Sequence, residues 1–153
     1  MSDSAIELHF RPATEVGHMR PQNPMLMSQR IVQVCLLLIA AICLFGGSLQ
    51  MYLGQPDTSP RLDNIHRFLA GVYFSTGIIN LWAAVTIRSQ GTLIFLLALG
   101  AFLAGVGRLV SMSQVGLPTP SALWLTYVIS ELLLPIVITL AHLATRRNAS
   151  PAS

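Results

Sequence analysis

The feature that most constrains this chain is a series of four apolar runs, each long enough to cross a bilayer. The runs cover residues 31–53, 66–87, 92–112 and 122–143. A membrane-spanning helix needs about 20 predominantly apolar residues. Helices of a water-soluble protein carry a polar stripe along one face, and these runs lack one. The sequence therefore predicts an all-α integral membrane protein, a four-helix bundle with the bilayer as its solvent.

Composition and charge agree with this class of protein. The chain has 153 residues, of which 53% are hydrophobic and 10% are charged. A soluble domain carries about 25% charged residues, so this chain has too little polar surface to cover a globule in water. All nine basic residues are Arg, and they flank or interrupt the apolar runs instead of forming a patch. No binding to nucleic acid is expected.

The segments outside the runs predict the domain organisation and the orientation. We expect a mostly disordered N-terminal tail at 1–27, a four-helix domain at 28–145 and a short C-terminal tail at 146–153. With four spans, six Arg residues fall on the side of the two tails: Arg11, Arg20, Arg30, Arg88, Arg146 and Arg147. Arg61 and Arg67 fall on the other side. Because basic residues concentrate in cytoplasmic segments, both termini are predicted to be cytoplasmic.

Small residues in the third run predict close helix packing. They recur at three- and four-residue spacing: Gly100, Ala101, Ala104, Gly105 and Gly107. Such spacing lets helix backbones approach each other where lipid gives no hydrophobic drive for association. The third run is therefore predicted to lie at the centre of the bundle.

Two ionisable residues inside the apolar runs need an explanation. A charge near the centre of a membrane helix costs about 2.5 kcal/mol or more on insertion scales. Glu131 lies close to the middle of the fourth run, and Arg108 lies toward the outer, non-cytoplasmic end of the third. Adjacent spans run antiparallel, so both residues fall in the outer half of the bilayer. The side chain of Arg108 can reach Glu131 there.

More polar residues cluster at the outer end of the second run. They are Asp63, Asn64, His66 and Arg67. In the fourth run, Pro135 has no backbone N–H, so the carbonyl oxygen of Glu131 loses its helical partner and a helix break is predicted. Irregular backbone at this depth is tolerated where it is buried or lines a cavity. We therefore predict a polar pocket in the outer half, formed by the second, third and fourth runs.

Structural explanations of the same residues stay open. Glu131 and Arg108 can form an ion pair that only fixes the register of two helices. Arg67 can extend its charged group toward the interface, and His142 is interpreted as an interfacial residue. No second His or Cys lies three or four residues from His66 or His142, and no nucleophile or cofactor motif is present. We therefore assign no catalytic residue, metal or cofactor.

Several of these polar residues lie in segments that carry a family resemblance. The segments are residues 63–73 (DNIHRFLAGVY), 107–111 (GRLVS), 116–118 (GLP), and Glu131-Leu132 followed by Pro135. This series resembles the small bacterial membrane proteins grouped as domain of unknown function 4345 (DUF4345), over roughly Val34 to His142. The resemblance implies a four-helix protein of the bacterial inner membrane, and it implies no activity.

Three functions fit these observations. The first is a non-enzymatic bundle that binds a lipid-like or small apolar ligand, or that serves as an accessory subunit of a membrane complex. The second is a small oligomeric transporter or proton-coupled carrier that uses Glu131. The third is a membrane enzyme acting on a lipid or quinone, with Glu131 as acid or base and Arg108 stabilising an anion. Expected partners are the lipid bilayer, a lipid or apolar ligand, and further copies or subunits in a complex.

Overall fold

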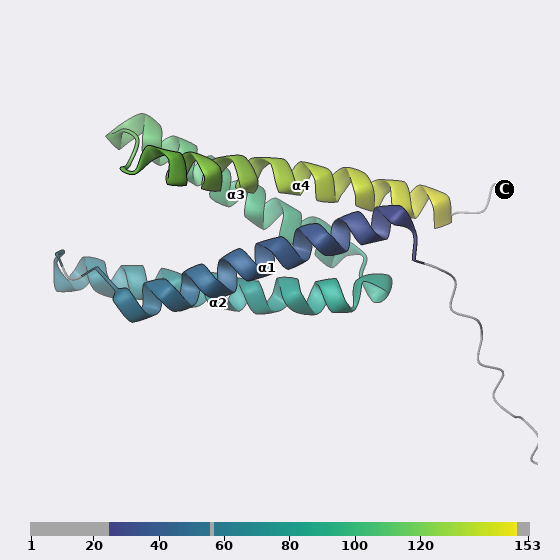
Figure 1. The fold of residues 1–153 in the computed structure, drawn as a ribbon, viewed down its shortest axis with the longest axis horizontal. Helices are drawn as coiled ribbons and strands as arrows, with labels where there is room; N and C mark the ends of the chain where they lie inside the picture. Colours follow the sequence, from purple (N-terminus) through teal and green to yellow (C-terminus); the bar gives the residue numbers. More distant parts are fainter. Residues whose placement is uncertain (1–24, 56, 150–153) are drawn as a thin grey trace, which may run out of the picture.

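The computed structural model describes residues 25–55 and 57–149, and within them the chain is helical. Its elements are α1 (Met27–Leu53), α2 (Pro60–Val85), the short 3-10 helix η1 (Ile87–Ser89), α3 (Thr92–Val115) and α4 (Ser121–Ala149) (Figure 1). Each of the four α-helices is long and apolar enough to cross a membrane. The all-α, four-helix fold predicted from the apolar runs is confirmed.

The helices extend beyond the predicted spans. α2 begins at Pro60, six residues before the predicted start at 66, because Ser59-Pro60 starts a helix as well as ending a turn. The Ser59 side chain accepts a hydrogen bond from the backbone N–H of Leu62, and Pro60 occupies the first turn, where its missing N–H costs nothing. At the end of α1, Gly54 has φ +61°, a left-handed conformation that glycine adopts readily.

The tail boundaries also differ from the prediction. α1 already begins at Met27, and α4 continues to Ala149, so Arg146 and Arg147 belong to the last turn of α4 and not to a tail. The apolar pattern ends earlier than the helix does, because polar residues can continue a helix beyond the membrane. The predicted tail residues 1–24 and 150–153 lie outside the described residues.

The helices form two hairpins, α1–α2 and α3–α4, and the first is held by glycines. A Cβ atom on Gly47 would lie 2.9 Å from the carbonyl oxygen of Ala70 and 2.9 Å from the backbone nitrogen of Phe74. A Cβ atom on Gly77 would lie 3.0 Å from the backbone nitrogen of Leu44. Both positions thus require glycine, and the two backbones approach as closely as they do in small-residue membrane interfaces.

The hairpins lie together at one end of the molecule and diverge toward the other (Figure 1). We call the end where the described chain begins and ends the termini end, and the opposite end the loop end. The shared core gathers residues of all four helices and η1, among them Val32, Leu36, Ala83, Ile87, Ile94 and Ile138. α1 packs against both α2 and α4, whereas α3 packs mainly against α4. The prediction that the third run lies at the centre is wrong, since α1 occupies that place.

Of the small residues predicted to pack on α3, Gly105 packs tightly against α4 and the other four do not. A Cβ atom on Gly105 would lie 2.9 Å from the Leu132 side chain and 3.1 Å from the Cβ atom of Glu131, so Gly105 packs tightly against α4. Four others are exposed or half-buried: Gly100, Ala101, Ala104 and Gly107. A Cβ atom on Gly100 or Gly107 would meet nothing within 4 Å. Since α3 has one main neighbour, only one face of its small-residue pattern is used inside the described chain.

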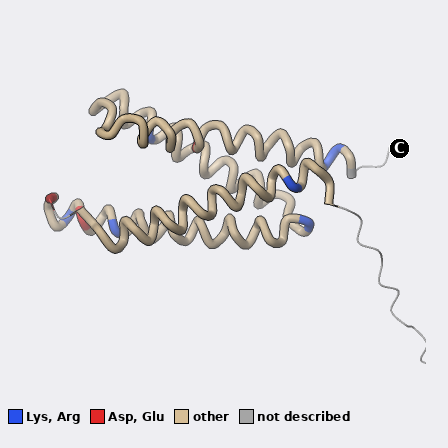
Figure 2. The backbone as a smooth tube through the Cα atoms, viewed as in Figure 1, with Lys and Arg blue, Asp and Glu red and all other residues tan. Residues whose placement is uncertain are grey.

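Charged residues gather at the two ends of the bundle (Figure 2). At the termini end lie Arg30 in α1, Arg88 in η1, and Arg146 and Arg147 in α4. The loop end carries both signs, with Arg61, Asp63 and Arg67 in α2 and Asp57 just before it. Within the described ranges the termini end holds no acidic side chain.

Candidate functional site

The central feature of the site is an ion pair between α3 and α4. The Nε atom of Arg108 donates to the Oε2 atom of Glu131 over 2.7 Å. The side chains are 29% and 11% exposed, respectively. Glu131 lies ten residues from the start of α4 at Ser121, which is about 15 Å along the helix axis. The structure thus brings together the two ionisable groups that the sequence places in the apolar layer.

Two aromatic side chains of α4 flank the guanidinium group. The Cζ atom of Arg108 lies 5.6 Å from the ring centroid of Trp124 and 5.3 Å from that of Tyr127. These distances suit cation–π attraction, which is stronger away from water. An Arg guanidinium has five N–H donors, and the ion pair uses the one on Nε. The remaining donors of Arg108 have no hydrogen bond among the described residues.

Neither Tyr127 nor Trp124 is among the site residues predicted from the sequence. The available signal was spacing: Tyr127 and Trp124 lie four and seven residues before Glu131. Residues at these intervals share one face of a helix. The face of α4 that carries the carboxylate therefore also carries the two rings.

Pro135 does not break α4. The helix runs through it from Ser121 to Ala149. The predicted break is wrong, because the flanking turns continue the helix although Pro135 supplies no N–H. The carbonyl oxygen of Glu131 nevertheless has no N–H donor at position 135. The turn that carries the carboxylate thus also carries a backbone acceptor.

Asp63 and Arg67 form a separate cluster at the loop end. The Oδ1 atom of Asp63 accepts from the backbone N–H of Gln55 over 2.7 Å, and its Oδ2 atom accepts from the Nε atom of Arg67 over 2.9 Å. Arg67 also donates through Nη1 to the carbonyl oxygen of Met51. This carbonyl lies in the last turn of α1, where carbonyl groups lack helical partners. The cluster therefore fastens the end of α1 to the start of α2.

We predicted a single polar pocket formed by the second, third and fourth runs. In the structure, its polar residues lie in two separate clusters. α2 makes few contacts with α3, because the two hairpins diverge toward the loop end. His66 is half-buried and Asn64 is exposed. Neither side chain has a hydrogen bond or ion pair within the part of the chain that the structure describes. Only Glu131 and Arg108 of the predicted set form the site between α3 and α4.

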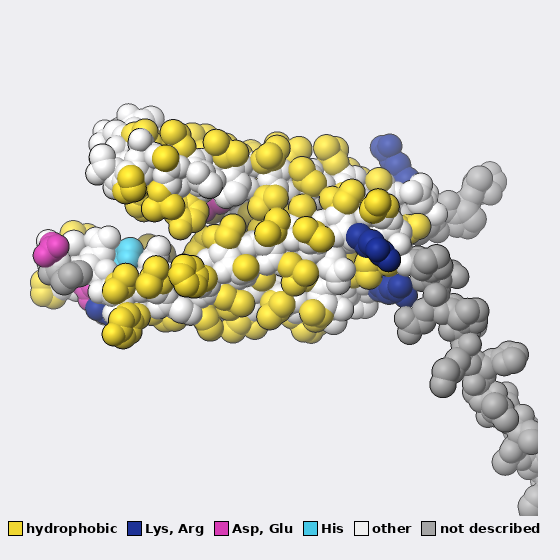
Figure 3. Space-filling view, in the orientation of Figure 1, with side chains coloured by type: hydrophobic (Ala, Val, Ile, Leu, Met, Phe, Trp, Pro, Cys, Tyr) yellow, Lys and Arg dark blue, Asp and Glu magenta, His cyan; other side chains and the backbone are white. Residues whose placement is uncertain are grey.

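An apolar groove lies between α1 and α4. It has a volume of about 380 Å³ and is lined by Leu38 and Ile42 of α1 and by Thr126, Ile129, Ser130, Leu133 and Leu134 of α4. The hydroxyl of Thr126 donates to the carbonyl oxygen of Ala122, and that of Ser130 donates to the carbonyl oxygen of Tyr127. Both hydroxyls are thus satisfied by their own helix. Figure 3 shows the surface hollowed between the two hairpins, with acidic side-chain atoms visible inside the hollow.

A family model described as Domain of unknown function (DUF4345) matches residues 31–142. The chain belongs to the DUF4345 family. No curated protein and no solved structure matches it significantly. The DUF4345 region contains the ion pair, the Asp63–Arg67 cluster and every residue that lines the groove. Its description assigns no activity, so function has to be argued from the site itself.

Proposed function

We propose that this DUF4345 protein is a lipid-binding membrane protein, with an acyl chain of the lipid lying in the groove between α1 and α4. The observation that carries the proposal is the groove itself, a hollow of about 380 Å³ with a mainly apolar lining. Pockets for small molecules in proteins have volumes of about 300–1,000 Å³, so a segment of an acyl chain fits.

The lining favours an acyl chain over a polar ligand. Five of the seven lining residues are Leu or Ile, and the hydroxyls of the other two bond to their own helix. A polar ligand would lose its hydration without gaining hydrogen bonds, which is unfavourable. Leu37 of α1 and Ile129 and Leu133 of α4 are exposed, and both helices are long and apolar enough to cross a membrane. Lipid chains are therefore in direct reach of the groove.

Arg108 gives the site a group that can recognise the polar part of the same lipid. It lies seven residues from the end of α3 at Val115, which is about 10 Å along the helix axis. This depth suits the ester groups that join acyl chains to a headgroup. The free guanidinium N–H groups can donate to ester carbonyl oxygens, while Glu131 neutralises the charge of Arg108.

The geometry favours this proposal over a proton-coupled carrier. A carrier would need Glu131 to bind and release a proton. A proton on either carboxylate oxygen would remove the negative charge that Arg108 contacts over 2.7 Å. α3 and α4 also pack tightly beside this pair, through Gly105. The arrangement suits a static role for the pair better than repeated protonation.

A matched pair of serine substitutions tests the proposal. Ser130 lines the groove and donates to the carbonyl oxygen three residues earlier; Ser75 does the same on the exposed surface of α2. Ser130→Phe fills the groove, and Ser75→Phe adds the same ring to a lipid-facing surface. Native mass spectrometry of the purified full chain should show a retained phospholipid in the wild type and in Ser75→Phe, with several-fold lower occupancy in Ser130→Phe. Equal occupancy in the two variants would refute the groove as the site.

A further inference from the structure

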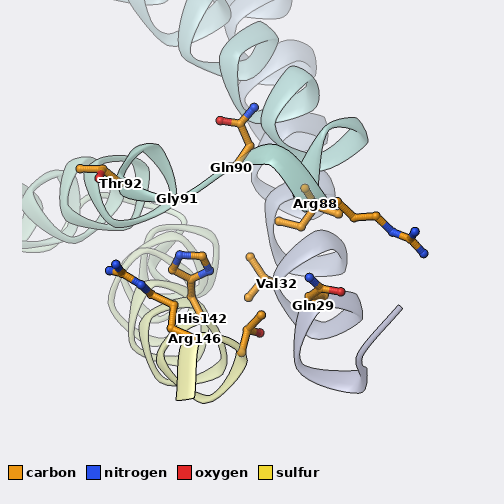
Figure 4. Close-up of a pocket in the computed structure, with 10 residues that line it drawn as sticks. Gln29, Val32, Arg88, Gln90, Gly91, Thr92, His142 and Arg146 are labelled. Atoms are coloured by element: carbon orange, nitrogen blue, oxygen red, sulfur yellow. The ribbon is translucent and has the colours of Figure 1, made fainter. Parts of the chain in front are cut away.

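A second cavity lies at the termini end, opposite to the divergence of the hairpins. It has a volume of about 270 Å³, and its lining comes from α1, η1, the start of α3 and the end of α4. Gln29, Val32, Ile87, Gly91, His142 and Thr145 are among the residues that form it (Figure 4). Unlike the groove, this cavity has a partly polar lining. It does not contribute to the function proposed above.

His142 is the unusual residue in this lining. It is only 6% exposed, and its Nε2 atom is buried without a hydrogen-bond partner among the described residues. Its ring packs edge-on against Phe95, with centroids 4.8 Å apart. Figure 4 shows the imidazole between Val32 and the Gly91 connection. Buried polar atoms in proteins nearly always have a partner, so a hydrogen-bonding group of a ligand or a water has a place at Nε2.

The chemistry of imidazole defines what that ligand must offer. Nε2 of a neutral imidazole either carries a proton or presents a lone pair. A hydroxyl group can donate to the lone pair and can accept from the N–H. A ligand that carries a hydroxyl therefore satisfies Nε2 in both tautomers.

A metal ion is a poor candidate for the lone pair. Neutral imidazole is a common metal ligand, but a stable site needs three or four such groups. Within the described residues no three His, Cys, Asp or Glu side chains are placed to hold a metal ion. A hydrogen-bond donor on an organic ligand fits the cavity better.

The electrostatics of the termini end favour an anion. Arg88 and Arg146 line the cavity, and Figure 4 shows their side chains extending outward from it on opposite sides. Arg30 and Arg147 add to the positive charge of this end, where the described ranges contain no acidic side chain. α3 begins at Thr92, and the first N–H groups of a helix attract negative charge. Basic pockets between membrane helices are known to bind the headgroups of anionic lipids.

We propose that this cavity binds the headgroup of an anionic phospholipid that carries a free hydroxyl, with phosphatidylglycerol as the fitting chemistry. The hydroxyl hydrogen bonds with Nε2 of His142. The phosphate lies at the start of α3, in the positive field of Arg88 and Arg146. The cavity lies at the termini end, the groove lies nearer the middle of the bundle, and they share no lining residue, so either site can exist without the other.

Three lipids and the full chain in detergent test the proposal by native mass spectrometry. Phosphatidylglycerol has the charge and the hydroxyl, phosphatidylmethanol has the charge alone, and phosphatidylcholine has no net charge. The wild type should bind phosphatidylglycerol roughly 3- to 10-fold more tightly than phosphatidylmethanol, the value of one hydrogen bond. Phosphatidylcholine should bind most weakly. Equal affinity for phosphatidylglycerol and phosphatidylmethanol would overturn the role of His142.

Variants test whether the preference for phosphatidylglycerol over phosphatidylmethanol arises in this cavity. His142→Phe should bind the two anionic lipids equally, while His142→Gln, whose amide oxygen can still accept, should keep part of the preference. His66→Gln at the loop end is the control and should behave as the wild type. Arg88→Gln combined with Arg146→Gln should weaken both anionic lipids alike. If His142→Phe does not fold, the comparison of wild type with His142→Gln decides. Equally tight binding of soluble glycerol phosphate would overturn the lipid as ligand.

Discussion

Gly105 on α3 lies against Glu131 on α4 so closely that a Cβ atom on the glycine would be 3.1 Å from that of the glutamate. The contact sets the distance between the two helices at the level of the ion pair. Arg108 lies three residues after Gly105 and reaches the carboxylate of Glu131 over 2.7 Å. The glycine and the ion pair are therefore parts of one helix contact.

Gly105→Ala should destabilise the protein, because the new methyl group would push α4 away. Overpacking of this kind costs about 1–3 kcal/mol. Gly107→Ala is the matched control on the same helix, where a Cβ atom meets nothing within 4 Å. Alanine favours a helix by about 1 kcal/mol over glycine, so the control should be neutral or stabilising. Thermal unfolding in detergent measures both, and similar melting temperatures would contradict the packing described here.

Glu131→Gln should lower the free energy of unfolding by about 1–3 kcal/mol, because it leaves the half-buried charge of Arg108 without a counter-ion. Arg108→Gln should do likewise. The double variant should be closer to the wild type than the sum of the two single changes. A double-mutant cycle in mixed micelles measures this coupling. Additive effects would mean that the 2.7 Å contact contributes nothing to the fold.

Asp63→Asn should lower stability less than Glu131→Gln does, because the Asp63–Arg67 pair is more exposed. It should also leave the retained lipid unchanged, since this cluster lies apart from the groove. Lipid occupancy by mass spectrometry checks the second point. Loss of the lipid in Asp63→Asn would show that the two clusters act together after all.

The termini end should face the cytoplasm, because the described part of this end carries Arg residues and no acidic side chain. Cysteine substitutions at Ser59 and Asn148 report on the two ends. A thiol reagent that cannot cross membranes should label Ser59→Cys in intact cells and should reach Asn148→Cys only after permeabilisation. The native Cys35 and Cys43 are buried and should give little background. The opposite labelling would invert the orientation.

The four helices were predictable because run length is a direct requirement of the bilayer. The pairing of Arg108 with Glu131 followed from antiparallel spans and the cost of burying charge. Which helices pack against each other, and through which faces, could not be predicted from the sequence. In a membrane an apolar side chain is as stable against lipid as against protein, so the sequence cannot distinguish the buried face of α3 from its lipid face. Gly100 and Gly105 therefore look equivalent in the sequence, although only Gly105 touches α4.

His142 shows the same limit for a polar residue. Its position near the end of the fourth run suggested the interface, yet it is buried. The reason is that α1, η1 and the start of α3 meet around the last turns of α4, and the hydroxyls of Ser28 and Thr145 join α1 to α4 over 2.7 Å. Contacts among four separate segments decide this burial, and no local pattern in the fourth run encodes them.

The divergence of the hairpins has a consequence for the surrounding membrane. A bundle that is narrow at one end and wide at the other displaces different areas of the two leaflets (Figure 1). Such a wedge fits most easily into a curved bilayer whose convex leaflet surrounds the wide end of the bundle. The shape of the protein thus links its free energy to local membrane curvature, independently of any ligand.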